Sequence, residues 1–157
     1  MSARLTRRTT LSFALPALLA ACGSRISETP VNPGTLYPGE TPQMRALIVK
    51  YAAYHAIPQS LLHRVIQRES GYNAAARNGP YYGLMQILPQ TARTMGYDGP
   101  PSGLLDGETN LRYAGAYLRG AWLVAGGDEN EAVHWYASGY YYEAKRLGLL
   151  EETGLRS

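Results

Sequence analysis

One carboxyl group lies where the sequence otherwise places only apolar side chains. Glu69 continues a helical face, because offsets of three, four, seven and eight residues stack on one side of a helix. The residues that precede it on this face are Leu61, Leu62, Val65 and Ile66. Burial among such neighbours disfavours the ionised carboxylate and raises its pKa toward the range of a general acid. Glu69 is therefore a candidate proton donor, and a helix-end Glu turned toward solvent is the alternative interpretation.

Two sets of residues follow Glu69 at a characteristic spacing. Ser70 comes directly after it, and the run Gly83-Leu84-Met85-Gln86-Ile87-Leu88-Pro89 is followed by Thr91-Ala92. Further along the chain come Asn110-Leu111, Gly115, Tyr117 and Leu118. Together these motifs resemble those of the soluble lytic transglycosylase family, relatives of goose-type lysozyme. The resemblance covers roughly residues 43–142.

This resemblance implies an all-α, lysozyme-like domain that cleaves peptidoglycan glycan strands. In the family a single Glu, here Glu69, protonates the β-1,4 bond between MurNAc and GlcNAc and then acts as a base. The 6-hydroxyl of the muramic sugar attacks its own anomeric carbon, and the product is a 1,6-anhydroMurNAc end. The resemblance implies no cofactor.

Four further residues match positions to which the resemblance assigns a role. Ser70 is expected to contact substrate, although a helix C-cap explains it equally well. Met85 and Gln86 are expected to line the cleft, and packing in the core is the alternative for Met85. Tyr136 matches a family Tyr whose hydroxyl hydrogen-bonds the catalytic Glu.

The sequence departs from the family pattern at two places. The family motif Ala-Tyr-Asn-Ala-Gly reads Trp135-Tyr136-Ala137-Ser138-Gly139, so an amide expected to touch substrate is missing at Ala137. The usual Gly-Ala-x-Gly before Leu-Met-Gln reads Pro80-Tyr81-Tyr82-Gly83. These changes leave two alternatives open: a non-catalytic peptidoglycan-binding or scaffold lipoprotein, and a hydrolytic lysozyme.

The other acidic residues do not offer an obvious second catalytic carboxylate. Asp98, Asp106 and Glu108 fall in loops or at a helix start, and an acidic cluster at residues 128–131 opens another helix. Acids suit the positive end of a helix dipole and need no catalytic explanation there.

The tyrosines suggest contacts with sugars, whereas the histidines do not suggest a metal site. The chain holds thirteen Tyr against one Phe. Several tyrosines flank the motifs, and their ring faces suit stacking on sugars; these are Tyr81, Tyr82, Tyr140, Tyr141 and Tyr142. The three histidines, His55, His63 and His134, lack metal-ligand spacing, so we expect no metal site.

The first residues are typical of a targeting segment. Residues 1–21 combine a basic start with a short apolar run, and Leu19-Ala20-Ala21-Cys22-Gly23 resembles a bacterial lipobox. We therefore predict a lipoprotein signal peptide over 1–21 and a lipidated Cys22; an ordinary signal peptide with a chance Cys is the alternative. Export by either the general or the twin-arginine route fits the paired arginines.

Processing removes the basic character of the chain. The formal net charge is +3, and the first 21 residues carry three arginines and no acid, so the remainder is neutral. This excludes an electrostatic case for nucleic-acid binding. The expected partners are peptidoglycan strands and the membrane that holds Cys22, in the periplasm. Gly23 after the Cys favours the outer membrane, and no partner machinery is indicated.

The remaining chain divides into a tether and one domain. Residues 22–41 comprise Cys22 and a stretch rich in Pro, Gly, Ser and Thr, which predicts a flexible tether. Residues 42–157 form the predicted catalytic domain. Its pattern predicts helices that begin at Pro42, after Pro58, at Pro89, near Gly107, after Asp128 and near Tyr140, and no strand.

We predict that the substitution Cys22→Ala releases the protein into the soluble periplasmic fraction. Stable anchoring needs two or more acyl chains, at about 0.8 kcal/mol per buried CH₂. Fractionation of cells that express either form measures this. A wild-type protein that is already soluble would contradict the lipobox interpretation.

Overall fold

The computed structural model describes residues 34–156 as a mainly helical domain. In chain order its elements are α1 (Pro42–His55), α2 (Gln59–Glu69), β1 (Arg77–Asn78), β2 (Tyr81–Tyr82), α3 (Pro89–Thr94), the 3₁₀ helix η1 (Pro101–Leu105), α4 (Gly107–Val124), α5 (Glu129–Ser138) and α6 (Tyr141–Leu147). The expectation of an all-α domain is confirmed. None of the described helices is long and apolar enough to cross a membrane.

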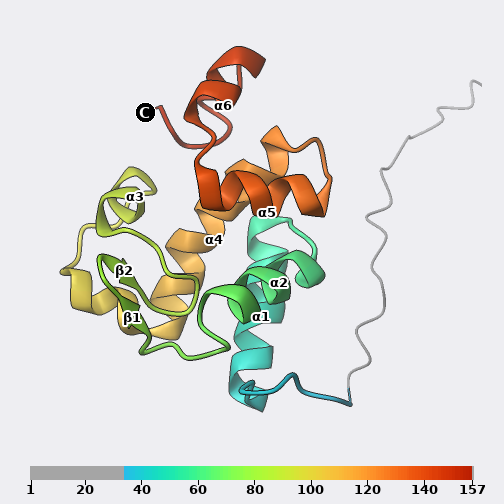
Figure 1. Ribbon diagram of the computed structural model, residues 1–157, viewed down its shortest axis with the longest axis vertical. Helices are drawn as coiled ribbons and strands as arrows, with labels where there is room; N and C mark the ends of the chain where they lie inside the picture. Colours follow the sequence, from blue (N-terminus) through green and yellow to red (C-terminus); the bar gives the residue numbers. More distant parts are fainter. Residues whose placement is uncertain (1–33, 157) are drawn as a thin grey trace, which may run out of the picture.

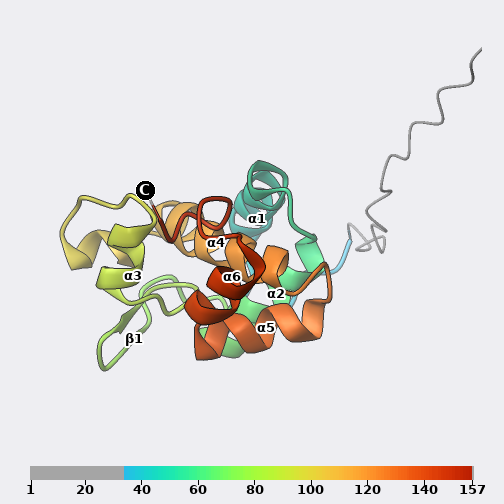
Figure 2. The same cartoon turned by 90° about the horizontal axis from the view of Figure 1, so that it is seen from above.

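The long helix α4 holds the domain together. It packs against α1, α3, α5, α6 and η1. In Figures 1 and 2 it lies between the hairpin and α3 on one side and α1 and α2 on the other. Elements from both halves of the sequence therefore share one helix as their support.

Helix starts follow the capping residues that the sequence indicated. Thr41 Oγ1 accepts a hydrogen bond from the Met44 N–H, with Pro42 in the first turn. Asp106 caps α4 through the Thr109 N–H, and Asp128 caps α5. These acids therefore serve helix ends, as predicted.

The prediction of no strand was wrong for residues 77–82. β1 and β2 form a short antiparallel hairpin, in which Asn78 faces Tyr81. Gly79 supplies the positive φ of 56° that the tight connection requires. Two-residue strands are too short to show an alternating pattern, which explains why no strand was predicted here.

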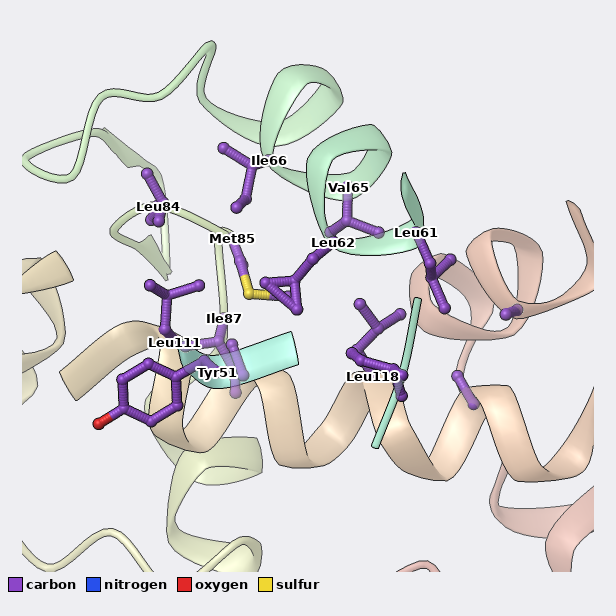
Figure 3. Packing of buried hydrophobic residues seen from close by; sticks show 14 of the residues in the cluster. Tyr51, Leu61, Leu62, Val65, Ile66, Leu84, Met85, Ile87, Leu111 and Leu118 are labelled. Carbon is purple, nitrogen blue, oxygen red and sulfur yellow. The ribbon is translucent and has the colours of Figure 1, made fainter. Parts of the chain in front are cut away.

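The core forms where α2 faces α4 across the segment that follows the hairpin. Figure 3 shows Leu62 and Val65 of α2 directed toward Leu111 and Leu118 of α4. All four side chains are almost wholly buried. The apolar face that leads to Glu69 is therefore the face that packs on the rest of the domain.

The packed domain begins earlier than the predicted boundary at residue 42. Glu40 is buried and forms an ion pair with Arg45 at 2.6 Å, and it accepts a hydrogen bond from the Tyr37 N–H. The Tyr37 ring stacks on Tyr72, with centroids 6.1 Å apart. Residues 37–41 were assigned to the tether because they lack apolar periodicity, but an ion pair and an aromatic stack hold them in place.

We predict that Glu40→Gln destabilises the domain by about 2 kcal/mol, because it leaves Arg45 without its counter-ion. Burial alone raises the pKa of Glu40, but hydrogen bonds from Arg45 and Tyr37 and the nearby His63 outweigh it, so the pKa lies below about 4.5. The stabilisation is thus present above about pH 4.5 and disappears as the pH falls through the lowered pKa. Thermal unfolding across this range measures both effects.

The matched control is Glu143→Gln, which removes an exposed ion pair with Arg146 on α6. Its unfolding midpoint should stay close to that of the parent, because exposed pairs contribute little. Equal behaviour of the two variants would show that the Glu40 pair does not hold the N-terminal segment.

Candidate active site

Glu69 is the last residue of α2, and its carboxyl group is partly exposed. Its side chain is 24% exposed, and Arg68 Nε lies 3.5 Å from Oε1. Desolvation raises the pKa of Glu69, and the charge of Arg68 lowers it by a smaller amount. The pKa direction agrees with the expectation for a general acid, but the group is reachable from solvent and has a basic neighbour.

Ser70 joins the end of α2 to the segment after the hairpin. It is the C-cap residue of α2, and its Oγ donates to the Leu84 carbonyl at 2.6 Å. The C-cap interpretation of Ser70 is therefore confirmed. Contact with substrate stays a prediction.

Met85 does not line a cleft, and that prediction was wrong. Its side chain is 0% exposed and packs between α2 and α4, near Leu62 and Ile87 (Figure 3). A flexible thioether fills such a gap well. The backbone of Met85, in contrast, takes part in the site: its N–H donates to Asn110, and its carbonyl accepts from Tyr136.

Asn110 is a positioning residue that the sequence reasoning did not single out. It is wholly buried on α4, and its Oδ1 accepts from the Met85 N–H at 2.9 Å. Its Nδ2 donates to the carbonyls of Tyr82 and Leu104, both at 2.9 Å. A signal was available: Asn110 precedes Ala114 and Leu118 at helical spacing, so it is a polar residue on an apolar face, like Glu69.

Tyr136 makes a different hydrogen bond from the one expected. Its hydroxyl donates to the Met85 carbonyl at 2.8 Å and not to Glu69. Burial raises the pKa of Tyr136 well above its ordinary value, and the charges of Glu69 and Tyr117 raise it further. Glu69 and Tyr136 are therefore electrostatic neighbours, but Tyr136 orients the backbone of Met85.

Gln86 adopts a strained backbone conformation beside a pocket. Its φ is 49°, in the left-handed region, and its Nε2 donates to the carbonyls of Ala76 and Gly83. Gly83 precedes it with φ of 77°, and a Cβ there would lie 2.1 Å from the Leu104 carbonyl oxygen. This turn therefore needs a glycine and fixes where the Gln86 amide lies.

A pocket of about 220 Å³ brings distant parts of the chain together. Its lining comprises Tyr81, Gln86, Ile87, Leu88, Thr91, Tyr117, Tyr136, Ala137, Ser138 and Gly139. The predicted residues Gln86 and Tyr136 thus meet in it, whereas Glu69 and Ser70 are not part of the lining. Glu69 lies near enough to the pocket residue Tyr136 for its charge to raise the pKa of the Tyr136 hydroxyl.

Two of the three histidines are buried. His55 is buried with Nε2 at 3.0 Å from the Leu111 carbonyl, and His63 is buried with Nδ1 at 2.7 Å from the Tyr72 hydroxyl. Within residues 34–156 no cluster of three or more His, Cys, Asp or Glu side chains could hold a metal ion. Cys22 lies outside the described residues.

Comparison with known families identifies the domain. A family model described as "Transglycosylase SLT domain" matches residues 46–148, from within α1 to the end of α6. The chain belongs to the transglycosylase SLT family. It therefore has the lysozyme-like fold of that family and is a lytic transglycosylase that acts on peptidoglycan. No solved structure matches the chain.

Membership of the SLT family agrees with the motif resemblance seen in the sequence. The matched region contains Glu69, the Leu84–Gln86 turn, Asn110 and Tyr136. The structure shows that Asn110 and Tyr136 both hydrogen-bond the backbone of Met85 in this turn. Residues from separate SLT motifs of this chain are thus connected through the Met85 backbone.

We predict that Asn110→Ala lowers the free energy of unfolding by about 2 kcal/mol or more, because it leaves the buried Met85 N–H and the Leu104 carbonyl without their partner, while the Tyr82 carbonyl keeps the Ile87 N–H. Urea unfolding measures the loss. Asn130→Ala is the control: this exposed Asn accepts from Arg64 on the surface, and its removal should cost less than about 0.5 kcal/mol. Equal losses would contradict the role of Asn110.

Proposed function

We propose that this SLT enzyme cleaves the MurNAc–GlcNAc β-1,4 bond with Glu69 as its single acid/base and leaves a 1,6-anhydroMurNAc end. The observation that carries the proposal is the charge environment of Glu69. Glu69 ends α2 with its carboxyl partly buried, and its ion-pair partner among the described residues is Arg68, at 3.5 Å. No Asp or Glu lines the neighbouring pocket.

The reaction follows from one titratable group that acts twice. The protonated Glu69 gives its proton to the glycosidic oxygen as the bond from that oxygen to C1 of the muramic sugar breaks. The carboxylate then takes the proton of the 6-hydroxyl as O6 bonds to C1. Glu69 ends protonated, and no water is consumed.

An internal hydroxyl suits a site with one carboxylate. Hydrolysis with inversion or retention ordinarily needs a second carboxyl group, as a base for water or as a nucleophile. The 6-hydroxyl is already tethered to the reacting sugar, which gives it an entropic advantage over free water. Among the alternatives left by the sequence, the family favours the enzyme over a non-catalytic binding protein, and the lone carboxylate favours the transglycosylase over the lysozyme.

We also propose that the enzyme is anchored through a lipidated Cys22 in the periplasm, on the outer membrane. Contacts with the domain begin at Thr35, whose carbonyl accepts a hydrogen bond from Arg45, so residues 23–34 would form the link. A flexible chain of that length spans roughly 20 Å on average. This reach would place the active site above the membrane surface and near the glycan strands.

We predict that digestion of purified peptidoglycan releases fragments with anhydro ends, whose mass is lower than that of a hydrolysis product by one water. Anhydro ends also resist borohydride reduction, so mass spectrometry before and after reduction separates the two products. Exclusive formation of reducible muramic ends would replace the transglycosylase with a lysozyme.

Glu69→Gln is the matched variant for this experiment, because it keeps the shape of the side chain and removes the transferable proton. Cleavage should fall to background while the helical circular dichroism is unchanged. In the parent, kcat/KM should fall as the pH rises through the pKa of Glu69, which desolvation raises. Retained cleavage by the variant would exclude Glu69 as the acid.

A further inference from the structure

Two departures from the family sequence pattern meet in one pocket. Tyr81 stands in the altered stretch before Gly83, and Ala137 stands where the family motif has Asn. Both line the 220 Å³ pocket, one from the hairpin and the other from the end of α5. One wall has thus lost an amide, and the other has gained a large aromatic side chain.

The hairpin holds Tyr81 in a fixed position. Tyr81 pairs with Asn78, and the next residue, Tyr82, exchanges both backbone hydrogen bonds with Ile87 at 3.0 and 3.1 Å. The Tyr82 carbonyl also accepts from Asn110. Because the segment is tied on both sides, the backbone that carries Tyr81 loses little freedom when a ligand contacts the ring.

Neighbouring tyrosines of β2 have different roles because successive side chains of a strand point to opposite faces. Tyr82 packs against the core, and the guanidinium of Arg77 lies 4.8 Å from the centre of its ring. Tyr81 lines the pocket and is 42% exposed. Its ring is thus available to a ligand, whereas the Tyr82 ring is already covered.

The opposite wall offers few hydrogen bonds to a ligand. Ala137 has none in its side chain, and Ser138 Oγ donates to the His134 carbonyl at 2.9 Å. The Tyr136 hydroxyl is engaged by Met85. Recognition by residues 136–138 is therefore mainly by shape, and a ligand needs other pocket residues to hold it.

We propose that Tyr81 is a specificity-determining residue that holds an N-acetylhexosamine ring of the glycan strand by stacking on its face. It takes over the retention of substrate that an amide at position 137 would otherwise give. β-Linked sugars of this class present C–H groups on the flat of the ring, which suit an aromatic face, while Thr91 and Gln86 offer polar groups in the same pocket. The proposal rests on the proposed function only for the class of substrate.

The test measures binding of a β-1,4-linked tetramer of N-acetylglucosamine to the purified chain by titration calorimetry. Tyr81→Ala should weaken binding about tenfold, the size typical of one lost aromatic contact, and Tyr81→Phe should stay within about twofold because it keeps the ring. Tyr54→Ala is the control, since Tyr54 is a 67% exposed tyrosine on α1 outside the pocket.

A second pair of variants tests the compensation. Adding Ala137→Asn to Tyr81→Ala should recover at least threefold of the lost affinity, whereas the same substitution in the parent should change it less. On cell walls Tyr81→Ala should raise KM with little change in kcat, because stacking away from Glu69 is equal in ground and transition states.

The outcomes separate this proposal from the proposed function. Unchanged affinity and KM in Tyr81→Ala would overturn it, and so would an equal loss in Tyr81→Phe, which would assign binding to the hydroxyl and not to the ring. Both quantities are independent of whether the product ends are anhydro or reducing. Failure of the transglycosylase chemistry would therefore leave the role of Tyr81 intact.

Discussion

The buried backbone of residues 84–86 is the constraint on which the rest of the structure depends. This segment crosses the core without a strand or helix of its own, so its N–H and C=O groups must find partners elsewhere. The side chains that supply them are Ser70 from α2, Asn110 from α4 and Tyr136 from α5. Three helices that are distant in sequence are thereby fixed to one turn, and each missing partner would cost about 1–3 kcal/mol.

This constraint explains why SLT motif residues have structural roles next to Glu69, the proposed acid/base. The Ser70 and Tyr136 hydroxyls both donate to backbone carbonyls of the turn, at Leu84 and Met85. They fix the end of α2, and therefore the place of Glu69, relative to the pocket. The side chains of Tyr81 and Ala137 in the pocket walls make no such hydrogen bond to the turn, so this chain can differ from the family there without loss of the fold.

The sequence predicted those features that depend on neighbouring residues. Pro42 and Asp128 identified helix starts, since these signals act within one turn, and the apolar spacing identified α2 and the face on which Glu69 lies. Contacts between distant segments were beyond this reasoning. Spacing alone does not show that the Tyr136 hydroxyl meets Met85, that the Met85 side chain turns inward, or that Glu40 pairs with Arg45 across the expected boundary.

Glu69 and Asn110 show how one sequence signal leads to two roles. Each is polar on an apolar helical face. Asn110 lies near the start of α4, and its neutral amide is satisfied by three backbone groups. Glu69 ends its helix, where the negative end of the dipole disfavours a carboxylate, and desolvation raises its pKa in the same direction. Arg68 offsets this only in part. The position that makes the charge unfavourable also leaves the carboxyl partly exposed, which is the accessibility that the proposed proton donor needs.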